Sequence, residues 1–427
     1  MTEASLSIPV TSSGSGRIGM GLVEFIITIA LMTACVSLAI DSMLPALPRI
    51  GEALHVANTN DTQLVIGVFF FGFGLAQLIF GSLSDTYGRR NILLGGLVFY
   101  AGTMFAASWT GSFTLLLTLR FAQGIGAAAV RITTMAIVRD CFGGREMARV
   151  MSYVMIVFMI VPILAPSMGQ LIITIATWPW IFIVLGSAGA FLFLWAFSRM
   201  KESLPLTERL PLSTASVKAG FRTVLTNRIT CGYMIGLTLF TGVISGYVMS
   251  VQQVFGEVFG LGDWLPIAFA ATALGIAFAN FANGYFVRRF GMRRISHAAV
   301  ILFTVIATFG FAVSLAGRPS FIFTYVLITT MLVMFGAITT NFTAICLEPM
   351  GHLAGTATSI TGFVSTTAGA LLGGGVGQMF DGTIRPLLGG FALFGTLTIV
   401  AVLWAERGRL FSHPGDDPKL EPGAGGH

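Results

Sequence analysis

Charged side chains are scarce in this sequence. Only 10% of its 427 residues are Asp, Glu, Lys or Arg, whereas soluble domains carry about 25%. A soluble protein of this length needs many polar side chains to cover its core, and too few are present here. The composition therefore excludes a large soluble enzyme.

Residue types that mark common enzyme and cofactor sites are also few. The sequence has four cysteines, whose spacing does not suggest a metal site. It has five histidines and contains no zinc-protease motif, no G-x-x-x-x-G-K-[ST] loop and no G-x-S-x-G motif. These features argue against an enzyme, a metal centre and ATP-driven transport. A channel would need a continuous polar pore lining, which a few isolated charges do not supply.

Long apolar runs are what the sequence has instead. A membrane-spanning helix needs about 20 mostly apolar residues. Twelve runs meet this requirement, and the first is too long for a signal peptide, so we interpret it as a retained helix. The runs cover residues 20–46, 63–83, 91–109, 113–137, 149–174, 179–198, 229–255, 264–287, 295–316, 320–346, 353–378 and 385–405. We therefore expect an all-α membrane protein.

Lys and Arg are distributed unevenly over the connections between these runs. If the N-terminus is cytoplasmic, the inside segments hold 19 of them and the outside segments hold only Arg49, Arg318 and Arg385. This asymmetry follows the positive-inside rule. It predicts that both termini are cytoplasmic. The net charge of +6 then reflects topology and implies no nucleic-acid partner.

A central polar segment divides the runs into six and six. We expect a cytoplasmic N-terminal segment (1–19), an N-terminal six-helix bundle (20–198), a central cytoplasmic loop (199–228), a C-terminal six-helix bundle (229–405) and a cytoplasmic tail (406–427). The tail is rich in Pro and Gly and is expected to be disordered.

A motif in the first half has a degenerate copy in the second. GSLSDTYGRR (81–90) follows the second run, and NGYFVRRFGMRRI (283–295) follows the eighth. The corresponding residues are Gly88, Arg89 and Arg90 in the first copy and Gly291, Arg293 and Arg294 in the second. Paired repeats are typical of transporter folds. The repeat predicts two pseudo-symmetric six-helix bundles.

These motifs resemble a known transporter family. GSLSDTYGRR and RFAQGIGAAA (120–129) are similar to segments of the major facilitator superfamily. Four other stretches resemble its bicyclomycin/chloramphenicol-resistance (Bcr/CflA) branch of drug:proton antiporters: IDSMLPALPRIGEAL (40–54), AIVRDCFGGREMARVMSYVM (136–155), PILAPSMGQLI (162–172) and GTATSITGF (355–363). The resemblance covers about residues 20–405.

The resemblance implies the major facilitator fold and a monomer in the bacterial inner membrane. It also implies multidrug efflux: export of amphipathic or lipophilic small molecules in exchange for protons, and hence antibiotic resistance. The proton gradient would drive transport, so no cofactor is expected. Two alternatives stay open, namely a proton-coupled exporter of one metabolite (an amino acid, sugar or nucleoside) and an uptake symporter.

The first copy of the motif is expected to gate the pathway. In the superfamily, the loop after helix 2 packs against the cytoplasmic end of helix 11 in the outward-facing state. Gly81 and Gly88 allow close approach and a sharp turn, and Asp85 is stabilised near a helix N-terminus. Arg89 and Arg90 can pair across the gate. The alternative is that these two arginines only set the topology.

Ionisable groups at membrane depth are costly, so they are candidates for function. Asp41 precedes prolines that end or bend the first helix, and desolvation favours the proton-bound form of a carboxylate. The resemblance implies that this acid couples protons and recognises cationic drugs. The alternative is an interfacial aspartate at the outer end of helix 1. Glu24 is expected either to take part in transport or to reach the inner interface by snorkelling.

Two arginines in helix 4 are further candidates. The resemblance implies that Arg120 tunes the protonation of the helix 1 acid, although an ion pair that only orders the helices is the alternative. Gln123 lies three residues on and shares its face. Arg131 lies about three turns beyond Arg120. It is expected to contact an anionic or zwitterionic substrate or to pair with helix 1 or helix 5.

Helix 5 carries an incomplete antiporter motif. It keeps Pro166 and Gly169, while Pro162 adds a second break, and the two prolines are expected to kink the helix. Met155, on the same helix, is a candidate for lining an adaptable apolar pocket.

Overall fold

A computed structural model describes residues 19–209 and 214–411, and every regular element in those residues is helical. Twelve spans in these ranges are long and apolar enough to cross a membrane. The expected all-α fold with twelve spanning helices is confirmed. Residues 1–18 and 412–427, which make up most of the expected terminal segments, lie outside the described residues.

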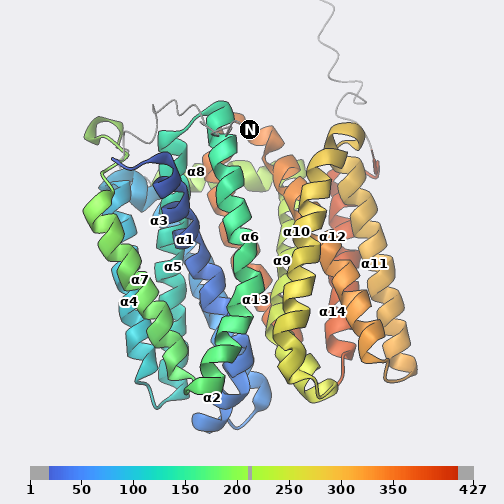
Figure 1. The fold of residues 1–427 in the computed structure, drawn as a ribbon. Coiled ribbons are helices and arrows are strands. Elements are labelled where there is room, and N and C mark those ends of the chain that lie inside the picture. Colours follow the sequence, from blue (N-terminus) through green and yellow to red (C-terminus); the bar gives the residue numbers. More distant parts are fainter. Residues whose placement is uncertain (1–18, 210–213, 412–427) are drawn as a thin grey trace, which may run out of the picture.

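Six spans form the first half of the molecule (Figure 1). The first begins with α1 (Leu22–Asp41) and continues through a 3₁₀ turn (Leu44–Ala46) and the short α2 (Leu47–Ala53). A second 3₁₀ turn (Thr59–Gln63) leads into the next span. The remaining helices are α3 (Leu64–Tyr87), α4 (Arg89–Ser108), α5 (Phe113–Cys141), α6 (Gly144–Ile175) and α7 (Pro179–Arg199).

The second half begins with α9 (Arg228–Gln253), which ends in a π-helical turn (Val254–Val258). The other spans are α10 (Leu265–Phe290), α11 (Met292–Ala316), α12 (Phe321–Leu347), α13 (Ala354–Gln378) and α14 (Arg385–Ala405). Short 3₁₀ turns lie at Leu206–Glu208, Gly262–Trp264 and Glu348–Leu353.

The two halves pair their helices in the same order. In the first half, α1 packs against α6, α3 against α5, and α4 against both α5 and α7. In the second half, α9 packs against α13, α10 against α12, and α11 against both α12 and α14. The halves meet where α3 contacts α13 and α6 contacts α10. The two pseudo-symmetric bundles expected from the repeated motif are confirmed.

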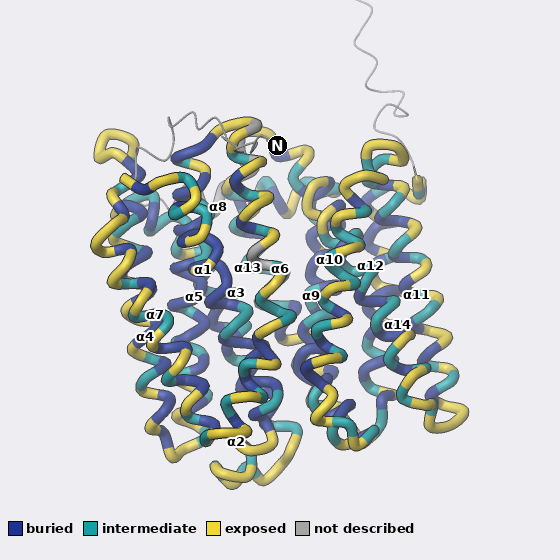
Figure 2. The backbone as a smooth tube through the Cα atoms, viewed as in Figure 1, coloured by how far each residue is buried: buried dark blue, intermediate teal, exposed yellow. Residues whose placement is uncertain are grey.

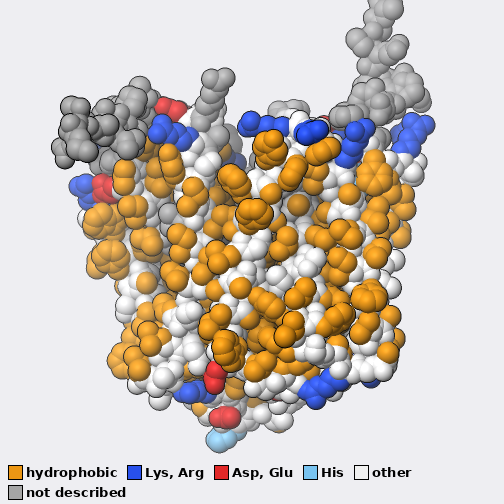
Figure 3. Space-filling view, turned by 45° about the vertical axis from the view of Figure 1, so that its right-hand side comes forward, with side chains coloured by type: hydrophobic (Ala, Val, Ile, Leu, Met, Phe, Trp, Pro, Cys, Tyr) orange, Lys and Arg blue, Asp and Glu red, His pale blue; other side chains and the backbone are white. Residues whose placement is uncertain are grey.

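The sides of the molecule are apolar. Large side chains such as Leu194, Phe278 and Phe281 are exposed, and Figure 3 shows hydrophobic side chains spread over the sides. Buried residues lie where helices face one another (Figure 2). An apolar surface of this extent fits a bilayer and not water.

Lys and Arg gather at one end of the molecule (Figure 3). We call this the basic end; α3 meets α4 there, and α10 meets α11. The other end, called the opposite end, holds the connections α9–α10, α11–α12 and α13–α14 and the connection between α2 and α3.

A single glycine joins the helices in both copies of the motif. Gly88 has φ 94° and ψ 148°, and Gly291 has φ 82° and ψ 155°. Side chains disfavour positive φ, so glycine suits both positions. Residues 81–87 belong to α3, and the loop expected after the second span is reduced to Gly88. The repeated motif thus encodes two equivalent helix ends.

The central segment contains a helix that the sequence analysis did not predict. α8 (Thr214–Thr226) packs against α13, where Gly220 lies close to Thr356 and Ile360. Phe221 meets Phe363 edge to face, with ring centroids 6.3 Å apart. α8 therefore covers the start of α13 at the basic end (Figure 1).

Candidate functional site

Asp41 is the last residue of α1 and lies where the first span breaks. Pro45 and Pro48 follow in the next two short helices, so α1 ends just before these prolines. The apolar helical stretch that begins at Leu22 continues past Asp41 to Ala53. Asp41 is 7% exposed, and none of the described residues forms a hydrogen bond or ion pair with its carboxylate.

Arg120 of α5 is fully buried and binds backbone carbonyls near Asp41. Its Nε donates to the carbonyl of Val65 in α3 at 2.8 Å, and its Nη2 donates to that of Ala39 in α1 at 3.0 Å. Its Nη1 donates to Oε1 of Gln123 at 2.9 Å. Arg120 thereby links α5 to α3 and α1. Its contact on α1, the carbonyl of Ala39, lies two residues before Asp41. Among the described residues it forms no ion pair, so the structure places the two groups near each other without direct pairing.

Gly169 brings α6 against the break in α1. A Cβ atom at this position would lie 2.1 Å from the carbonyl oxygen of Ser42. Only glycine therefore permits this approach to the residue that follows Asp41. Pro162 and Pro166 lie within α6, which remains one helix from Gly144 to Ile175. The helix 5 motif and the helix 1 acid, 120 or more residues apart in sequence, are neighbours.

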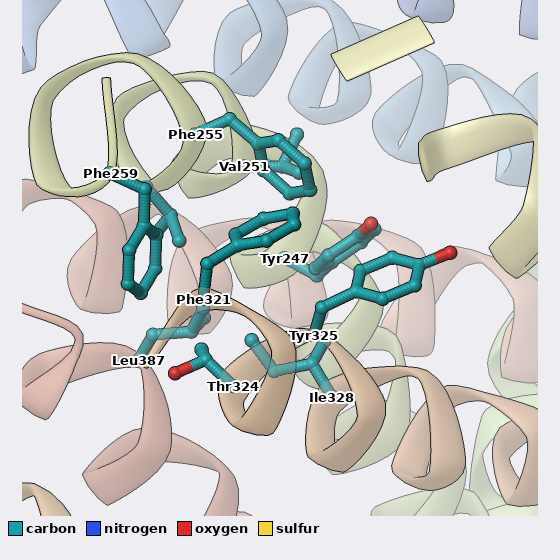
Figure 4. A pocket seen from close by; sticks show the side chains of 10 residues that line it. Tyr247, Val251, Phe255, Phe259, Phe321, Thr324, Tyr325, Ile328 and Leu387 are labelled. Atoms are coloured by element: carbon teal, nitrogen blue, oxygen red, sulfur yellow. The ribbon is translucent and has the colours of Figure 1, made fainter. Parts of the chain in front are cut away.

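An aromatic wall of the second half lies across from Asp41. Tyr247 of α9 lies in the neighbourhood of Asp41, and its ring stacks on Phe269 at a centroid distance of 6.0 Å. The hydroxyls of Tyr247 and Tyr325 point to the same side in Figure 4. The largely aromatic pocket beneath them has a volume of only about 10 Å³. That is room for one water at most, so the wall is tightly packed in this conformation.

The other predicted transport residues lie closer to the basic end. Arg131 is partly buried in α5, about 16 Å along the helix from Arg120. Met155 is partly buried in α6. Glu24 forms an ion pair with Arg199 at 2.9 Å, at the first turn of α1. This surface pair fits the interfacial interpretation of Glu24.

Arg89 is the centre of a charge network at the basic end of the first half. Its Nη1 lies 2.5 Å from Asp85, and its Nε lies 3.0 Å from Asp140 in the last turn of α5. Glu202 accepts the backbone N–H groups of Arg89 and Arg90 at 2.9 and 3.3 Å. Glu202, and not Asp85, is therefore the carboxylate at the N-terminus of α4. Its negative charge interacts favourably with the positive end of the helix dipole.

Arg90 binds the end of α7. Its Nε donates to the carbonyl of Met200 and its Nη2 to that of Phe197, both at 2.7 Å. The side-chain and backbone contacts described for both arginines therefore stay within the first half and the start of the central segment, although pairing across the gate was expected. Gly81 of the motif faces α13, where its position is close to Ser359.

The second half repeats this network around Arg293. Its Nε lies 2.8 Å from Glu406, just after α14, and its Nη2 lies 3.1 Å from Glu348 at the end of α12. Tyr233 donates to Glu406 at 2.7 Å and is 2.8 Å from Nε2 of His297. In the second copy Arg293 is buried, whereas its neighbour Arg294 is exposed.

Apart from Asp85, the acids of both networks were not predicted from the sequence. Asp140 corresponds to Glu348 at the end of the fourth helix of each half, and Glu202 corresponds to Glu406 after the sixth. Each pair is separated by a little over 200 residues, like the two glycines of the motif. Searching for acids at that offset would have found them.

Amide side chains join the two halves at the opposite end. Asn60 donates from Nδ2 to the carbonyls of Gln378 and Phe380 at 3.1 and 2.9 Å. Its Oδ1 accepts from Gln253 at 2.9 Å, and its carbonyl accepts from the side chain of Gln378 at 2.8 Å. Gln63 also donates to Gln253. We call Asn60, Gln63, Gln253 and Gln378 the amide clasp; sequence patterns gave no sign of it.

The halves also touch midway between the two ends. Gln77 of α3 donates to Thr366 of α13 at 2.9 Å. Gly74 lies against Thr367, whose backbone nitrogen would stand 2.8 Å from a Cβ on this glycine. Close helix contact of this kind relies on small residues.

Comparison with known proteins agrees with this architecture. Residues 29–374 match the family model of the Major Facilitator Superfamily. The chain is 26% identical over 389 residues to a bicyclomycin resistance protein homolog of Haemophilus influenzae, covering 89% of this chain and 94% of that one. It is 31% identical over 261 residues to the multidrug resistance protein MdtL of Shewanella oneidensis, covering 59% and 63%.

A solved structure shares the fold. The human organic anion transporter MFSD10 (TETRAN) superposes with a TM-score of 0.64 at 19% identity, over 90% of this chain and all of that one. The resemblance drawn from the sequence motifs is confirmed by these matches. This multi-pass membrane protein belongs to the Major Facilitator Superfamily.

Proposed function

We propose that this protein exports amphipathic drugs or related small molecules across the bacterial inner membrane in exchange for protons. Both termini would then lie in the cytoplasm, at the basic end of the molecule, as the positive-inside rule predicts. The proton gradient would drive the cycle without a bound cofactor, and a single copy of the chain would suffice.

The unpaired carboxylate of Asp41 carries this proposal. An ionised carboxylate that is buried without a partner bears a large desolvation cost. Asp41 is buried at the break of α1, and its carboxylate has no hydrogen-bond or ion-pair partner in the described part of the chain. Proton binding removes the cost in the closed state, and contact with water or with a cationic substrate removes it in the open state. Such a group can exchange a proton for substrate.

The surroundings of Asp41 support an amphipathic substrate. Arg120 and Gly169 fix the backbone on either side of the acid, while Tyr247 and Phe269 supply aromatic faces from the second half. Aromatic faces attract organic cations and apolar rings. Relatives that carry bicyclomycin-resistance and multidrug-resistance names support the same substrate class.

Proton release from inside-out vesicles tests the proposal. The lumen is acidified, a pH-sensitive dye is included, and tetraphenylphosphonium or chloramphenicol is added outside. The wild type should show substrate-induced proton efflux, and Asp41→Asn should not. Asp263→Asn makes the same chemical change at an exposed position and should behave as wild type.

Three outcomes would contradict parts of the proposal. Equal efflux from wild type and Asp41→Asn would keep antiport but remove Asp41 as the proton carrier. Glu24→Gln is then the next variant to test. Substrate export that persists after the proton gradient is collapsed would refute proton coupling. No response in the wild type, with the protein shown to be inserted, would refute the proposed substrate class.

A further inference from the structure

A cavity lies at the opposite end of the second half. Three connections meet there: the end of α9, the α11–α12 loop and the α13–α14 loop. The cavity has a volume of about 130 Å³, the space of roughly four waters at liquid density. Its lining includes Val258 and Phe259 at the end of α9, Arg318 and Pro319 before α12, and Ile384 and Arg385 before or at the start of α14. Phe259 separates it from the aromatic pocket of Figure 4.

Two of the three arginines expected outside the cell membrane line this single cavity. Arg385 is held in place because its Nε donates to the carbonyl of Ser314 at 2.9 Å, and that bond leaves its terminal nitrogens for other acceptors. Arg318 has no hydrogen-bond or ion-pair partner among the described residues. Two guanidinium groups with unused donors thus converge on one space.

The acid in the same loop as Arg385 does not pair with either arginine. Asp381 lies in the same loop as Arg385, but its Oδ1 accepts from the backbone N–H and the hydroxyl of Thr383, at 3.0 and 2.6 Å. Neither arginine forms an ion pair with it within 4.0 Å in the described structure. The N-terminus of α14 at Arg385 adds a favourable dipole for an anion. No acid lines the cavity, and neither arginine has an ion-pair partner in the described part of the chain.

The walls of the cavity indicate where the anion comes from. Val258, Phe259, Pro319 and Ile384 make one side apolar. Just outside, Leu315 at the end of α11 and Ile322 at the start of α12 are largely exposed on the lipid-facing surface. A ligand with an anionic head and an apolar body fits this arrangement, whereas a free inorganic ion would use only the arginines.

We propose that this cavity binds the phosphate group of an anionic phospholipid in the leaflet at the opposite end. Arg318 and Arg385 bind the phosphate oxygens, since planar guanidinium groups suit phosphate geometry. The acyl chains lie along α11 and α12. The site is separate from the transport pathway proposed above and does not depend on it.

Lipid-resolved native mass spectrometry of the full-length protein tests this site. Wild type should bind phosphatidylglycerol in preference to phosphatidylcholine of the same chain length. Arg318→Gln should reduce that preference about fivefold, since each basic residue near a membrane surface contributes about that factor. Arg318→Lys should restore most of it. Because Arg318 has no partner in the described protein, these variants should fold normally.

Arg49→Gln is the matched control. Arg49 is the third arginine of this end, and it donates to the carbonyl of Ile173, away from the cavity. This variant should keep the wild-type preference. Equal binding of both lipids by wild type, or an unchanged preference in Arg318→Gln, would overturn the proposal. Binding of inorganic phosphate that phosphatidylglycerol does not displace would assign the cavity to a free anion and overturn the lipid assignment.

Discussion

Replacing Asn60 with alanine is expected to open the molecule at the opposite end. The asparagine side chain makes three hydrogen bonds between the halves, two to the carbonyls of Gln378 and Phe380 and one from Gln253. Each such bond contributes about 0.5–1.5 kcal/mol net. Losing all three should disfavour the closed arrangement by about 1.5–4.5 kcal/mol, or roughly 10- to 2,000-fold in the equilibrium between closed and open forms.

Electron–electron double resonance measures this shift directly. Spin labels at Glu52→Cys and Asp263→Cys, both exposed at the opposite end, report the separation of the halves once the native cysteines are replaced. Asn60→Ala should move the distance distribution to longer values. Thr59→Ala is the control, because this neighbouring side chain is exposed and forms no hydrogen bond in the described structure. Identical distributions in wild type and Asn60→Ala would refute the role of the amide clasp.

Three other substitutions test the packing that surrounds the candidate site. Gly169→Ala should abolish most transport while keeping expression, because its Cβ would meet a backbone carbonyl at 2.1 Å; drug-efflux assays check this. Gly88→Ala should lower the free energy of unfolding by about 1–3 kcal/mol, because of its positive φ, as measured by denaturation in detergent. Glu406→Gln should lower the free energy of unfolding by about 1–3 kcal/mol, because Arg293 keeps only one carboxylate partner. Thermal unfolding would measure this loss.

Each of these substitutions has a control or a contrary outcome. Gly95→Ala places a methyl group where nothing lies within 4 Å, so both transport and stability should be preserved. Wild-type efflux by Gly169→Ala would mean that α6 moves away from the break in α1 without consequence. Unchanged unfolding of Gly88→Ala or Glu406→Gln would mean that the helix junction or the charge network contributes nothing to stability.

Helix placement follows closely from the sequence. The twelve apolar runs predict the twelve spans, because the bilayer requires about 20 apolar residues in each. The glycine–arginine repeat predicts the two equivalent halves, because Gly88 and Gly291 have the same backbone conformation at the same junction. Both signals are local, so they can be read without knowing which helices touch. The central helix α8 was not predicted, because its apolar residues are buried only by packing against α13, which is distant in sequence.

The partners of the charged residues depend on the tertiary structure. The sequence indicated Arg120 and Asp41, yet Arg120 binds the carbonyls of Val65 and Ala39 and not the acid. It indicated the motif arginines, yet not the distant acids that Arg89 and Arg293 meet. In each case the partner comes from a helix far away in sequence.

The sequence by itself determined that the chain spans a membrane twelve times in two related halves. The length of each apolar run and the charge of each connection can be assessed segment by segment, so both can be predicted without knowing which helices pack together. Only the tertiary structure decided that Asp41 is buried at a break, that Gly169 lies against it, and that amides from three connections fasten the opposite end. Those features arise from packing between helices. Contacts between residues that are far apart in the chain leave no periodic pattern in a single sequence.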